Sequence, residues 1–486
     1  MNINTFYNGD EFEAYNYFGA HITDKGILFR TYAPNAEKVS VVGDFSKWED
    51  IPMKRINDGR FFEILCPNAK EGMRYKYRIY SNEEDFIDHC DPYGFSMEVR
   101  PGTCSVIRNL NYKFTDNKWL ENRTDCRDKP MNIYEVHLGS WKRKSDENEK
   151  GWYSYSEIAD KLVDYLCEYG YNFVELMPLS EHPCDESWGY QCTGFFAPTS
   201  RYGTPVQLEF VNKCHKKNIG VIMDFVPFHF AVDNYALAEY DSTKLYEFPD
   251  DEAGYNEWGS KNFMHSKGEV RSFLNSAANY WLSVYHFDGL RVDAVRNMIY
   301  WNGRDYLGEN KYAIQFLKDM NSGLKARHPS AVLIAEDSSA YPKVACPVFD
   351  GGLGFDYKWD LGWMHDTLEY FQSAPIYRTR DYHKLTFSML YFFNEKYILP
   401  LSHDEVVHGK ATIVQKMNGY YDDKFPQARA MYMYMIAHSG KKLNFMGNEF
   451  GQLREWDEKR QQDWDMLKYP MHVLSENILK SLIKYI

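Results

Sequence analysis

Gly289-Leu-Arg-Val-Asp-Ala-Val295 begins as a short apolar run and ends on an aspartate and a loop. Leu333-Ile-Ala-Glu-Asp-Ser338 and Leu401-Ser-His-Asp-Glu405 repeat this arrangement. Each stretch places a carboxylate where a buried strand gives way to a loop. A β/α barrel holds its catalytic groups at strand ends of this kind. The three stretches together therefore predict a barrel with an acidic site at one end.

The chain from Met131 onward alternates apolar runs with helical patterns, which indicates β/α units and a parallel sheet. Eight strands with helices between them predict a (β/α)8 TIM barrel, an α/β fold, over residues 131–486. A largely polar stretch at about 230–265 is the longest insertion. The eight runs that we interpret as strands are Ile133–Val136, Phe173–Leu176, Val221–Phe225, Gly289–Val292, Val332–Ala335, Gly354–Tyr357, Tyr397–Leu401 and Leu443–Met446.

One barrel helix has a clear start signal. Ser154-x-x-Glu157 is the pattern of a capping box, in which the two side chains satisfy backbone N–H groups at a helix start. Apolar residues then follow on one helical face, at Ile158, Leu162, Leu166 and Tyr169.

The first part of the chain has a different pattern of apolar and polar residues from the rest. Short alternating runs separated by turn residues predict a small β-sandwich domain over residues 1–108. A polar stretch at 109–130 is interpreted as a linker. The runs are Ile27–Tyr32, Lys38–Val42, Phe61–Leu65 and Tyr75–Tyr80.

Composition excludes several classes of function. The net charge of −13 argues against nucleic acid as a partner. The sequence has no run of about 18 apolar residues that would predict a membrane span, and its first residues do not resemble a signal peptide. We therefore expect a cytoplasmic protein. We also expect it to be a monomer. The nine cysteines form no C-x-x-C pair, which favours reduced thiols over a zinc site. Aromatic residues make up 17%, which fits either sugar-binding surfaces or an aromatic-rich core.

Arg291 and Asp293 are two residues apart on one strand, so their side chains point to the same face. An adjacent arginine favours the ionised carboxylate, which makes Asp293 a candidate nucleophile. Glu336 follows an apolar strand, and partial desolvation there raises the pKa of a carboxyl and suits it to act as a general acid. A structural ion pair is the alternative for the first motif.

Further polar residues follow two other strands. Asp404 and His403 lie just past one apolar run, and Asp224 and His229 lie at the end of another. A lone histidine at a strand end is usually structural. Two histidines, each with an aspartate nearby at a barrel rim, favour sugar binding. One carboxylate as nucleophile and one carboxyl as proton donor is the requirement of glycosidic chemistry.

With these residues assembled, the chain resembles the α-amylase family of glycoside hydrolases, and within it the 1,4-α-glucan branching enzymes. The broad family is indicated by 224–229, 289–295, 335–337 and 402–404. The branching type is indicated by longer strings, namely Ile133-Tyr-Glu-Val-His-Leu-Gly-Ser-Trp141, Glu175-Leu-Met-Pro-Leu-Ser-Glu-His182, Ser187-Trp-Gly-Tyr-Gln191, His403-Asp-Glu-Val-Val-His-Gly-Lys410 and Phe445-Met-Gly-Asn-Glu-Phe-Gly-Gln452. The front segment resembles the carbohydrate-binding module that precedes the barrel in these enzymes.

The resemblance implies a retaining double displacement on an α-glucan. Glycogen or amylose-like chains would be both donor and acceptor. No nucleotide sugar or redox cofactor would be required. Asp293 would be the nucleophile, Glu336 the general acid and base, and Asp404 the stabiliser of the oxocarbenium-like transition state. The remaining residues would hold the sugar or position the nucleophile, and they are Tyr190, Asp224, His229, Arg291 and His403.

Two departures from the family pattern affect these expectations. Many amylases have Asn before the histidine of the first motif, where it helps bind calcium, but this chain has Phe228, so we expect no such calcium site and no metal. Branching enzymes normally continue into a C-terminal β-sandwich, which we expect to be absent here. Apolar barrel surface would then be exposed.

Two alternatives remain open at this point. The same triad serves hydrolysis, so an amylase or a debranching enzyme is one alternative. A poorly active glucan-binding protein is the other. Within the front domain, Trp48 and Tyr32 are either sugar platforms or core residues.

Overall fold

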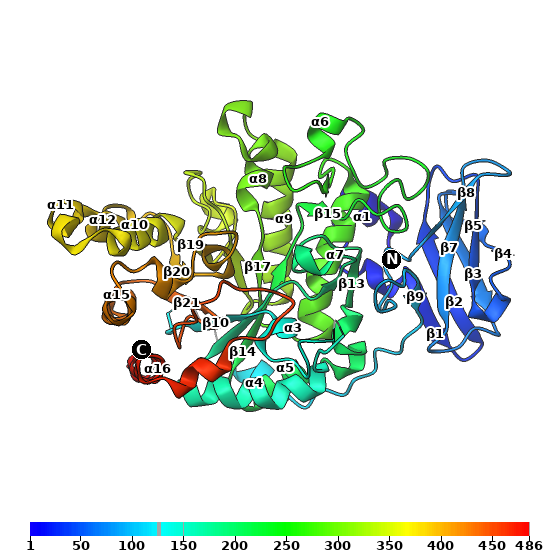
Figure 1. The fold of residues 1–486 in the computed structure, drawn as a ribbon. Helices are drawn as coiled ribbons and strands as arrows, with labels where there is room; N and C mark the ends of the chain where they lie inside the picture. The colour runs from blue at the N-terminus through cyan, green and yellow to red at the C-terminus, as the bar shows by residue number, and fades with distance from the viewer. Residues whose placement is uncertain (124–127, 149, 486) are drawn as a thin grey trace.

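The front domain is a pair of antiparallel sheets facing each other. The structure, a computed structural model, describes residues 1–123, 128–148 and 150–485. One sheet has the order β1-β2-β6-β5, and the other has the order β4-β3-β7-β8 with β9 beside β7. Figure 1 shows them stacked at one end of the molecule, in blue. The bounds are β1 Gly19–Thr23, β2 Gly26–Tyr32, β3 Lys38–Gly43, β4 Ile51–Pro52, β5 Lys54–Ile56, β6 Phe61–Cys66, β7 Arg74–Tyr80, β8 Phe86–His89 and β9 Ser105–Val106.

The four strand runs expected in this domain are therefore confirmed. Alternate residues are buried along most of β2 and β7, as the period of two requires, whereas β3 is buried on both faces after Lys38. Tyr32 is 5% exposed and packs edge-on against Phe6, so it belongs to the core and offers no open ring face. Trp48 is partly exposed and lies near the guanidinium of Arg74.

The second domain is a closed barrel of eight parallel strands in chain order, which confirms the predicted TIM barrel. Each strand pairs with its neighbours in parallel register, and the last pairs with the first. The strands are β10 Asn132–Val136, β11 Phe173–Leu176, β14 Gly220–Phe225, β17 Gly289–Val292, β18 Val332–Ala335, β19 Tyr357–Trp359, β20 Tyr397–Leu401 and β21 Lys441–Phe445.

One of the eight expected strands was placed too early. The sequence predicts a strand at Gly354–Tyr357, but β19 begins only at Tyr357. Gly354 has φ of 87°, which is left-handed backbone that cannot continue a strand. Asp356 instead accepts a hydrogen bond from the backbone N–H of Leu333 at 2.8 Å. A turn therefore occupies the first part of the apolar run.

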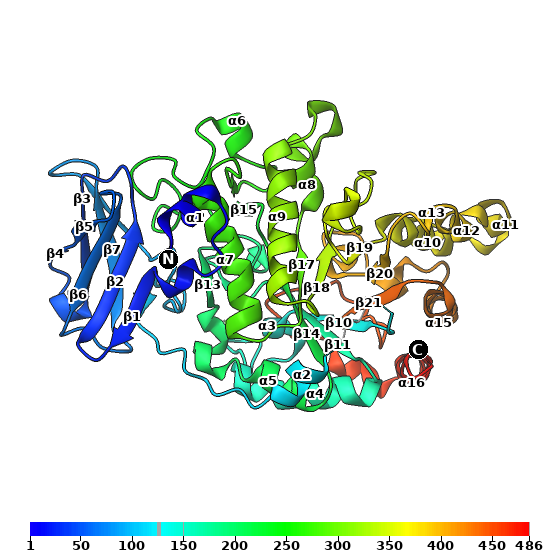
Figure 2. The same ribbon diagram turned by 180° about the vertical axis from the view of Figure 1, so that it is seen from behind.

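Helices cover the outside of the barrel (Figures 1 and 2). The expected capping box is confirmed, since Ser154 Oγ accepts from Glu157 N at 3.3 Å and Glu157 Oε2 accepts from Ser154 N at 2.8 Å. The apolar face that follows in α4 is buried, as expected. The main outer helices are α4 Tyr155–Tyr169, α5 Phe210–Lys216, α7 Gly268–Val284, α9 Lys311–Arg327, α10 Leu361–Gln372, α15 Tyr421–Ala437 and α16 Pro470–Ile483.

The two domains are joined by specific contacts. The loop after β14, which is the long insertion, touches the sandwich where Tyr240 OH bonds Thr31 Oγ1 at 2.7 Å and Asp241 accepts from Asn35 at 2.9 Å. The first helix, α1 Ile3–Asn8, lies on α7 of the barrel, as both ribbon views show. The stretch expected as a linker includes α2 Asn117–Asn122, whose Trp119 donates to Asp288 of the barrel; part of that stretch, 124–127, lies outside the described residues.

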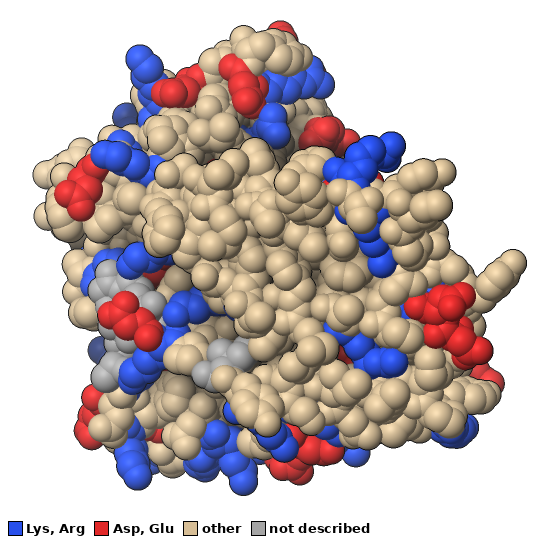
Figure 3. All heavy atoms as spheres, turned by 90° about the vertical axis from the view of Figure 1, so that its left-hand side faces the viewer, with Lys and Arg blue, Asp and Glu red and all other residues tan. Residues whose placement is uncertain are grey.

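One side of the barrel exposes many apolar side chains. Figure 3 shows this face, which is mostly uncharged, over α15, α16 and the short helices α11 Arg378–Asp381, α12 His383–Thr386 and α13 Ser388–Tyr391. Its most exposed apolar residues include Ile376, Leu390, Phe393 and Tyr420. In the described part of the chain, no helix is both long enough and apolar enough to cross a membrane.

Candidate active site

The three predicted carboxylates meet at the carboxyl ends of the barrel strands. Asp293 follows β17, Glu336 follows β18, and Asp404 follows β20 in the short turn His403–Val406. The guanidinium of Arg291 lies 2.8 Å from Asp293 Oδ1 and 3.9 Å from Glu336 Oε2. One arginine therefore holds the expected nucleophile and the expected acid beside each other.

The inward direction of these side chains follows from the strand period of two. Ile133, Ile222 and Ile334 are part of an apolar cluster in the barrel. Two residues further along the same strands, toward the mouth, the inward positions are polar: Glu135, Asp224 and Glu336. A polar layer thus lies above an apolar floor.

Arg291 is fixed from several sides. Its Nη1 lies 2.8 Å from both carboxylate oxygens of Asp224, and its guanidinium lies 4.4 Å from the centre of the Trp359 ring. Its side chain is 1% exposed. A buried arginine held in this way cannot swing away when substrate enters, so it keeps Asp293 oriented.

Asp293 and Glu336 titrate in the same range. Burial raises the pKa of Asp293 to about 7 and that of Glu336 to about 7, while Arg291 lowers both. Since the arginine contacts Asp293 directly and reaches Glu336 only at 3.9 Å, the carboxylate charge is better stabilised on Asp293. Near pH 7 the pair therefore carries one proton, with Asp293 ionised and Glu336 protonated.

The turn after β17 also serves Glu336. Ala294 has φ of 52° and ψ of 39°, a left-handed conformation that is uncommon for a residue with a side chain. This conformation directs its backbone N–H to Glu336 Oε2 at 2.8 Å. The bond orients the carboxyl, and the local strain lies at the reacting groups.

Asp404 is kept ionised by cationic neighbours. Burial would raise its pKa, but His403 and Arg291 lower it below the usual range. The His403 ring lies 3.7 Å from Asp404 and bonds Glu135 Oε1 at 2.5 Å through Nδ1. Burial would lower the pKa of His403, but Glu135 and Asp404 raise it to about 9, so His403 is a cation at neutral pH.

Tyr190 and His229 supply ring surfaces at the site. Tyr190 OH donates to Asp224 Oδ2 at 2.5 Å, and its ring stacks on His403 with centroids 5.7 Å apart. His229 packs on the ring of Trp258, and its Nδ1 bonds none of the described residues. Burial lowers the pKa of His229 to about 3, so this imidazole is neutral and able to bond a hydroxyl.

The structure thus links seven of the eight predicted residues by contacts centred on Arg291, Asp224 and His403. His229 lies at the same barrel end, in β15 His229–Phe230 just after β14, and its ring contacts Phe228 and Trp258. Phe228 before it is 5% exposed. Among the described residues, no group of three or more His, Cys, Asp or Glu side chains is placed to hold a metal ion.

Sequence reasoning missed two inward glutamates. The carboxylate of Glu135 bonds both the ring Nδ1 and the backbone N–H of His403. Glu175, directly across from Glu135 in the sheet register, is fully buried, and neither of its carboxylate oxygens bonds a described residue. Burial raises its pKa far above the usual value, so it is neutral. An acidic residue inside each apolar run was the signal that could have revealed them.

Comparisons with known proteins identify the relatives of this chain. Residues 17–94 match the family model for carbohydrate-binding module 48, the isoamylase N-terminal domain, and residues 141–258 match the alpha amylase catalytic domain. The 1,4-alpha-glucan branching enzyme GlgB of Fusobacterium nucleatum subsp. nucleatum is 49% identical over 95% of this chain and 76% of its own length. GlgB of Halothermothrix orenii is 47% identical over 98% of this chain and 78% of its own.

A solved structure also shares the fold. The pullulanase from Paenibacillus barengoltzii superimposes with a TM-score of 0.74 over 96% of this chain and 80% of its own, at 17% identity.

Proposed function

This chain belongs to the 1,4-alpha-glucan branching enzymes of the alpha-amylase family, and from that premise we propose how its residues carry out the reaction. It acts on alpha-glucans: it cleaves an α-1,4-linked chain and transfers it to a 6-hydroxyl, which forms an α-1,6 branch. It is a glycosyltransferase that works by transglycosylation.

In the first step, Asp293 attacks C1 of the donor sugar. Glu336 gives its proton to the glycosidic oxygen, so the reducing-side part of the chain leaves with a free 4-hydroxyl. The bond from C1 to that oxygen breaks as the ester to Asp293 forms. The protonation states near pH 7 supply the ionised nucleophile and the protonated acid that this step needs.

In the second step, Glu336 is the base. It accepts the proton of an acceptor 6-hydroxyl, whose oxygen attacks C1 and displaces the Asp293 carboxylate. The α configuration is retained because C1 is inverted twice, and both carboxyls return to their starting states.

The remaining residues hold the sugar at C1. Asp404, kept ionised by His403 and Arg291, faces the positive charge that develops on the sugar ring. The Tyr190 ring offers an apolar platform, and His403 and His229 are placed for sugar hydroxyls. Asp224 and Arg291 position the nucleophile.

The single observation that carries this assignment is the shared guanidinium, which keeps Asp293 ionised beside a protonated Glu336. The test is incubation with amylose, in which iodine-complex absorbance and reducing ends are followed together, with Asp293→Ala as the control. We expect absorbance to fall while reducing ends stay nearly constant, and debranching to release short chains. Reducing ends that rise in step with the loss of absorbance would show hydrolysis instead.

The domain boundaries, the cellular compartment and the oligomeric state are also proposals. We propose a sandwich domain at 1–108, a connecting segment at 109–130 and a catalytic barrel at 131–486, which the matched ranges 17–94 and 141–258 support. We propose a cytoplasmic monomer without a nucleic-acid partner. The free thiols of the described cysteines fit a reducing compartment, and the net charge of −13 disfavours phosphate backbones. Light scattering on the purified chain measures its oligomeric state.

A further inference from the structure

Lys416 is a buried lysine that the reaction described above does not use. It ends the short helix α14 Ile413–Lys416, which follows the loop after β20, and it is 9% exposed. Its Nζ donates to three backbone carbonyl oxygens of that loop, at 2.6 Å to Glu405, 2.5 Å to Lys410 and 2.7 Å to Ala411. Such convergence of carbonyl oxygens on one side chain calls for a functional explanation.

The three contacts require Lys416 to be an ammonium ion. A neutral amine has two N–H bonds, whereas an ammonium has three, one for each carbonyl oxygen. A compact ammonium also fits three convergent oxygens, which the planar fork of an arginine does not. A fixed positive charge is therefore held against the backbone of residues 405–411, which we call the rim loop.

The rim loop has a strained backbone. His408, Gly409 and Ala411 have φ of 57°, 77° and 66°, which places all three in the left-handed region. This conformation is unfavourable for His408 and Ala411, because each carries a Cβ. Strained backbone of this kind persists only where the surrounding contacts hold it.

A carboxylate binds the N–H groups of the same loop. Glu455 Oε2 accepts from the backbone N–H of Gly409 at 2.9 Å, and its Oε1 accepts from that of Ala411 at 2.7 Å. Ala411 is thus bound at its N–H by Glu455 and at its carbonyl oxygen by Lys416. Since hydrogen bonds to ionised groups are the strong ones, this cation and this anion together hold the rim loop in its left-handed conformation.

The rim loop carries groups that reach the active site. Lys410 Nζ donates to the backbone oxygen of Asp404 at 2.8 Å. The His408 ring stacks on Trp188 with centroids 5.2 Å apart, and Trp188 meets the His403 ring edge-on at 5.8 Å. Burial raises the pKa of Asp404, and Lys410 and His408 are among the cations that lower it. The conformation of the rim loop therefore affects the surroundings of Asp404.

We propose that Lys416 is a positioning residue for Asp404: its ammonium holds the rim loop in the strained conformation that places Lys410 and His408 at the active site. This proposal rests on the branching reaction described above, in which Asp404 stabilises the transition state. Backbone carbonyl oxygens are also ligands for metal cations. Here a tethered ammonium supplies the same charge from within the chain.

The first experiment replaces Lys416 by methionine, which has a similar length and no charge. In initial rates with amylose, measured as branch points after debranching, Lys416→Met should lower kcat about 50-fold and change KM less than about threefold. The split is expected because Asp404 acts mainly on the transition state. An unchanged kcat overturns the proposal.

Lys442→Met is the matched control. Lys442 is 6% exposed and also donates to backbone carbonyl oxygens, those of His438 and Gly440, at the amino end of β21. This is the opposite end of the barrel from Asp404, so Lys442→Met should keep kcat within about twofold although it loses a buried ammonium of the same kind. Equal losses of kcat in two variants with equal melting temperatures would show a general effect of stability and overturn the proposal.

Chemical rescue tests the charge itself. Lys416→Ala removes the tethered ammonium, and added propylammonium should raise kcat of this variant at least about fivefold, because its ammonium can bind the same three carbonyl oxygens. 1-Propanol has the same carbon chain without a charge and is the neutral comparison. A failure of propylammonium to rescue, or equal rescue by 1-propanol, overturns the role of the charge.

Hydrogen exchange, followed by mass spectrometry, separates this proposal from the assignment of the reaction. The N–H groups of Gly409 and Ala411 should exchange at least about tenfold faster in Lys416→Met, since the rim loop opens more often without the ammonium. Unchanged exchange overturns the proposal whatever the reaction is. If the loop loosens and cleavage slows, but the unmodified chain produces reducing ends in place of branches, the role of Lys416 stands and the branching assignment fails.

Discussion

Asp293 and Asp185 both contact arginine at the mouth of the same barrel, yet their pKa values move in opposite directions. Burial raises the pKa of Asp293 to about 7, although Arg291 opposes the rise. Burial would also raise the pKa of Asp185, but Arg100 and Arg201 lower it to about 2. The two sites differ in how many cations each carboxylate has.

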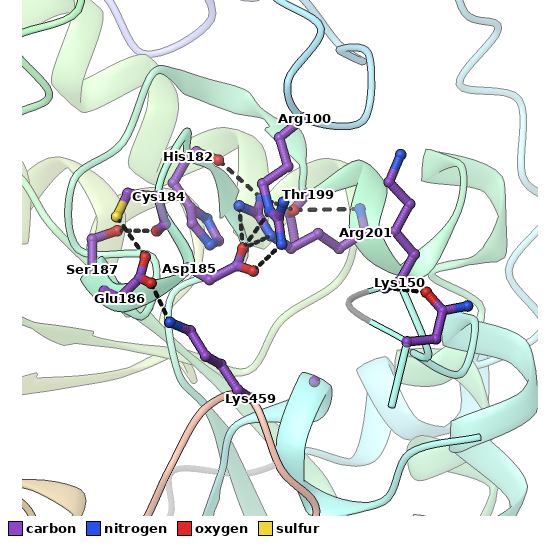
Figure 4. A network of polar contacts seen from close by, with 12 residues as sticks. Arg100, Lys150, His182, Cys184, Asp185, Glu186, Ser187, Thr199, Arg201 and Lys459 are labelled. Atoms are coloured by element: carbon purple, nitrogen blue, oxygen red, sulfur yellow. Dashed lines mark hydrogen bonds and ion pairs between the residues drawn. The ribbon is translucent and has the colours of Figure 1, made fainter. Parts of the chain in front are cut away.

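Around the nucleophile, carboxylates outnumber cations, since Arg291 is shared by Asp224, Asp293 and Glu336. In the loop after β11, Asp185 alone has two arginines, Arg100 and Arg201 (Figure 4). Proton transfer needs groups whose charge changes near the working pH. The comparison indicates that Asp293 can change its charge near neutral pH, whereas Asp185 keeps its charge and acts as an ion-pair partner.

The largest expected effect is on activity. Asp293→Ala removes the nucleophile and should lower kcat by at least about 10,000-fold, because no ester to the enzyme can form. Asp185→Asn should lower kcat/KM for amylose by less than about tenfold. Branching is measured by iodine absorbance and by chain-length analysis after debranching. Comparable losses in the two variants would contradict this difference between Asp293 and Asp185.

The second prediction concerns pH. Activity requires Asp293 ionised and Glu336 protonated, so kcat/KM should fall as pH drops below the pKa of Asp293 and fall as pH rises above that of Glu336. Because both lie at about 7, a narrow bell centred near pH 7 is expected, with a slope of about tenfold per pH unit on each side. Initial rates from pH 5 to pH 9 measure it. A plateau several pH units wide would show that the two carboxyls do not titrate as this pair.

A third prediction compares the two inward glutamates. Glu135→Gln removes the carboxylate that keeps His403 cationic, and kcat/KM should fall about 30-fold, with a steeper loss above pH 7 as His403 loses its proton. Glu175→Gln replaces a neutral carboxyl by a neutral amide and should change kcat/KM by less than about twofold. The pH profiles of both variants are the measurement, and equal losses would mean that Glu175 is charged.

The smallest expected effects are on stability. The folded-state pKa of Asp293 exceeds its unfolded value of 3.8, so the free energy of unfolding decreases as pH rises from about 4 to 7. Asp293→Asn should therefore raise the free energy of unfolding at pH 8 by about 2 kcal/mol. Asp185 has the opposite shift: its contribution is present above pH 4 and is lost as pH falls toward 2.

Asp185→Asn should accordingly lower the free energy of unfolding at pH 8 by about 2 kcal/mol or more, since two arginines lose their partner. Denaturant titrations of both variants at pH 8 test the pair. The comparison fails if the two changes have the same sign.

Much of the barrel could be predicted because each strand is a local signal. Apolar runs end in polar residues at β17, β18 and β20, and the strand period directs those residues inward. The start of β19 was predicted wrongly because an apolar run does not reveal the left-handed turn at Gly354.

Contacts between residues far apart in the chain could not be predicted from local sequence patterns. Glu135 and His403 are 268 positions apart, and Arg100 and Asp185 are 85 apart, so neither pair has a sequence signature. The two ion pairs of Asp185 depend on how a barrel loop and the sandwich domain pack, which spacing does not encode. The charge balance that separates Asp293 from Asp185 arises only from such packing.

The contacts between the long loop after β14 and the sandwich domain have a consequence for how the protein is made. Thr31 and Asn35, which bind Tyr240 and Asp241 of that loop, leave the ribosome more than 200 residues earlier. Domains generally fold as units during synthesis, N-terminal first. We therefore expect the sandwich to act as a template on which the loop settles as it emerges, before the strands that carry Asp293, Glu336 and Asp404 have been translated.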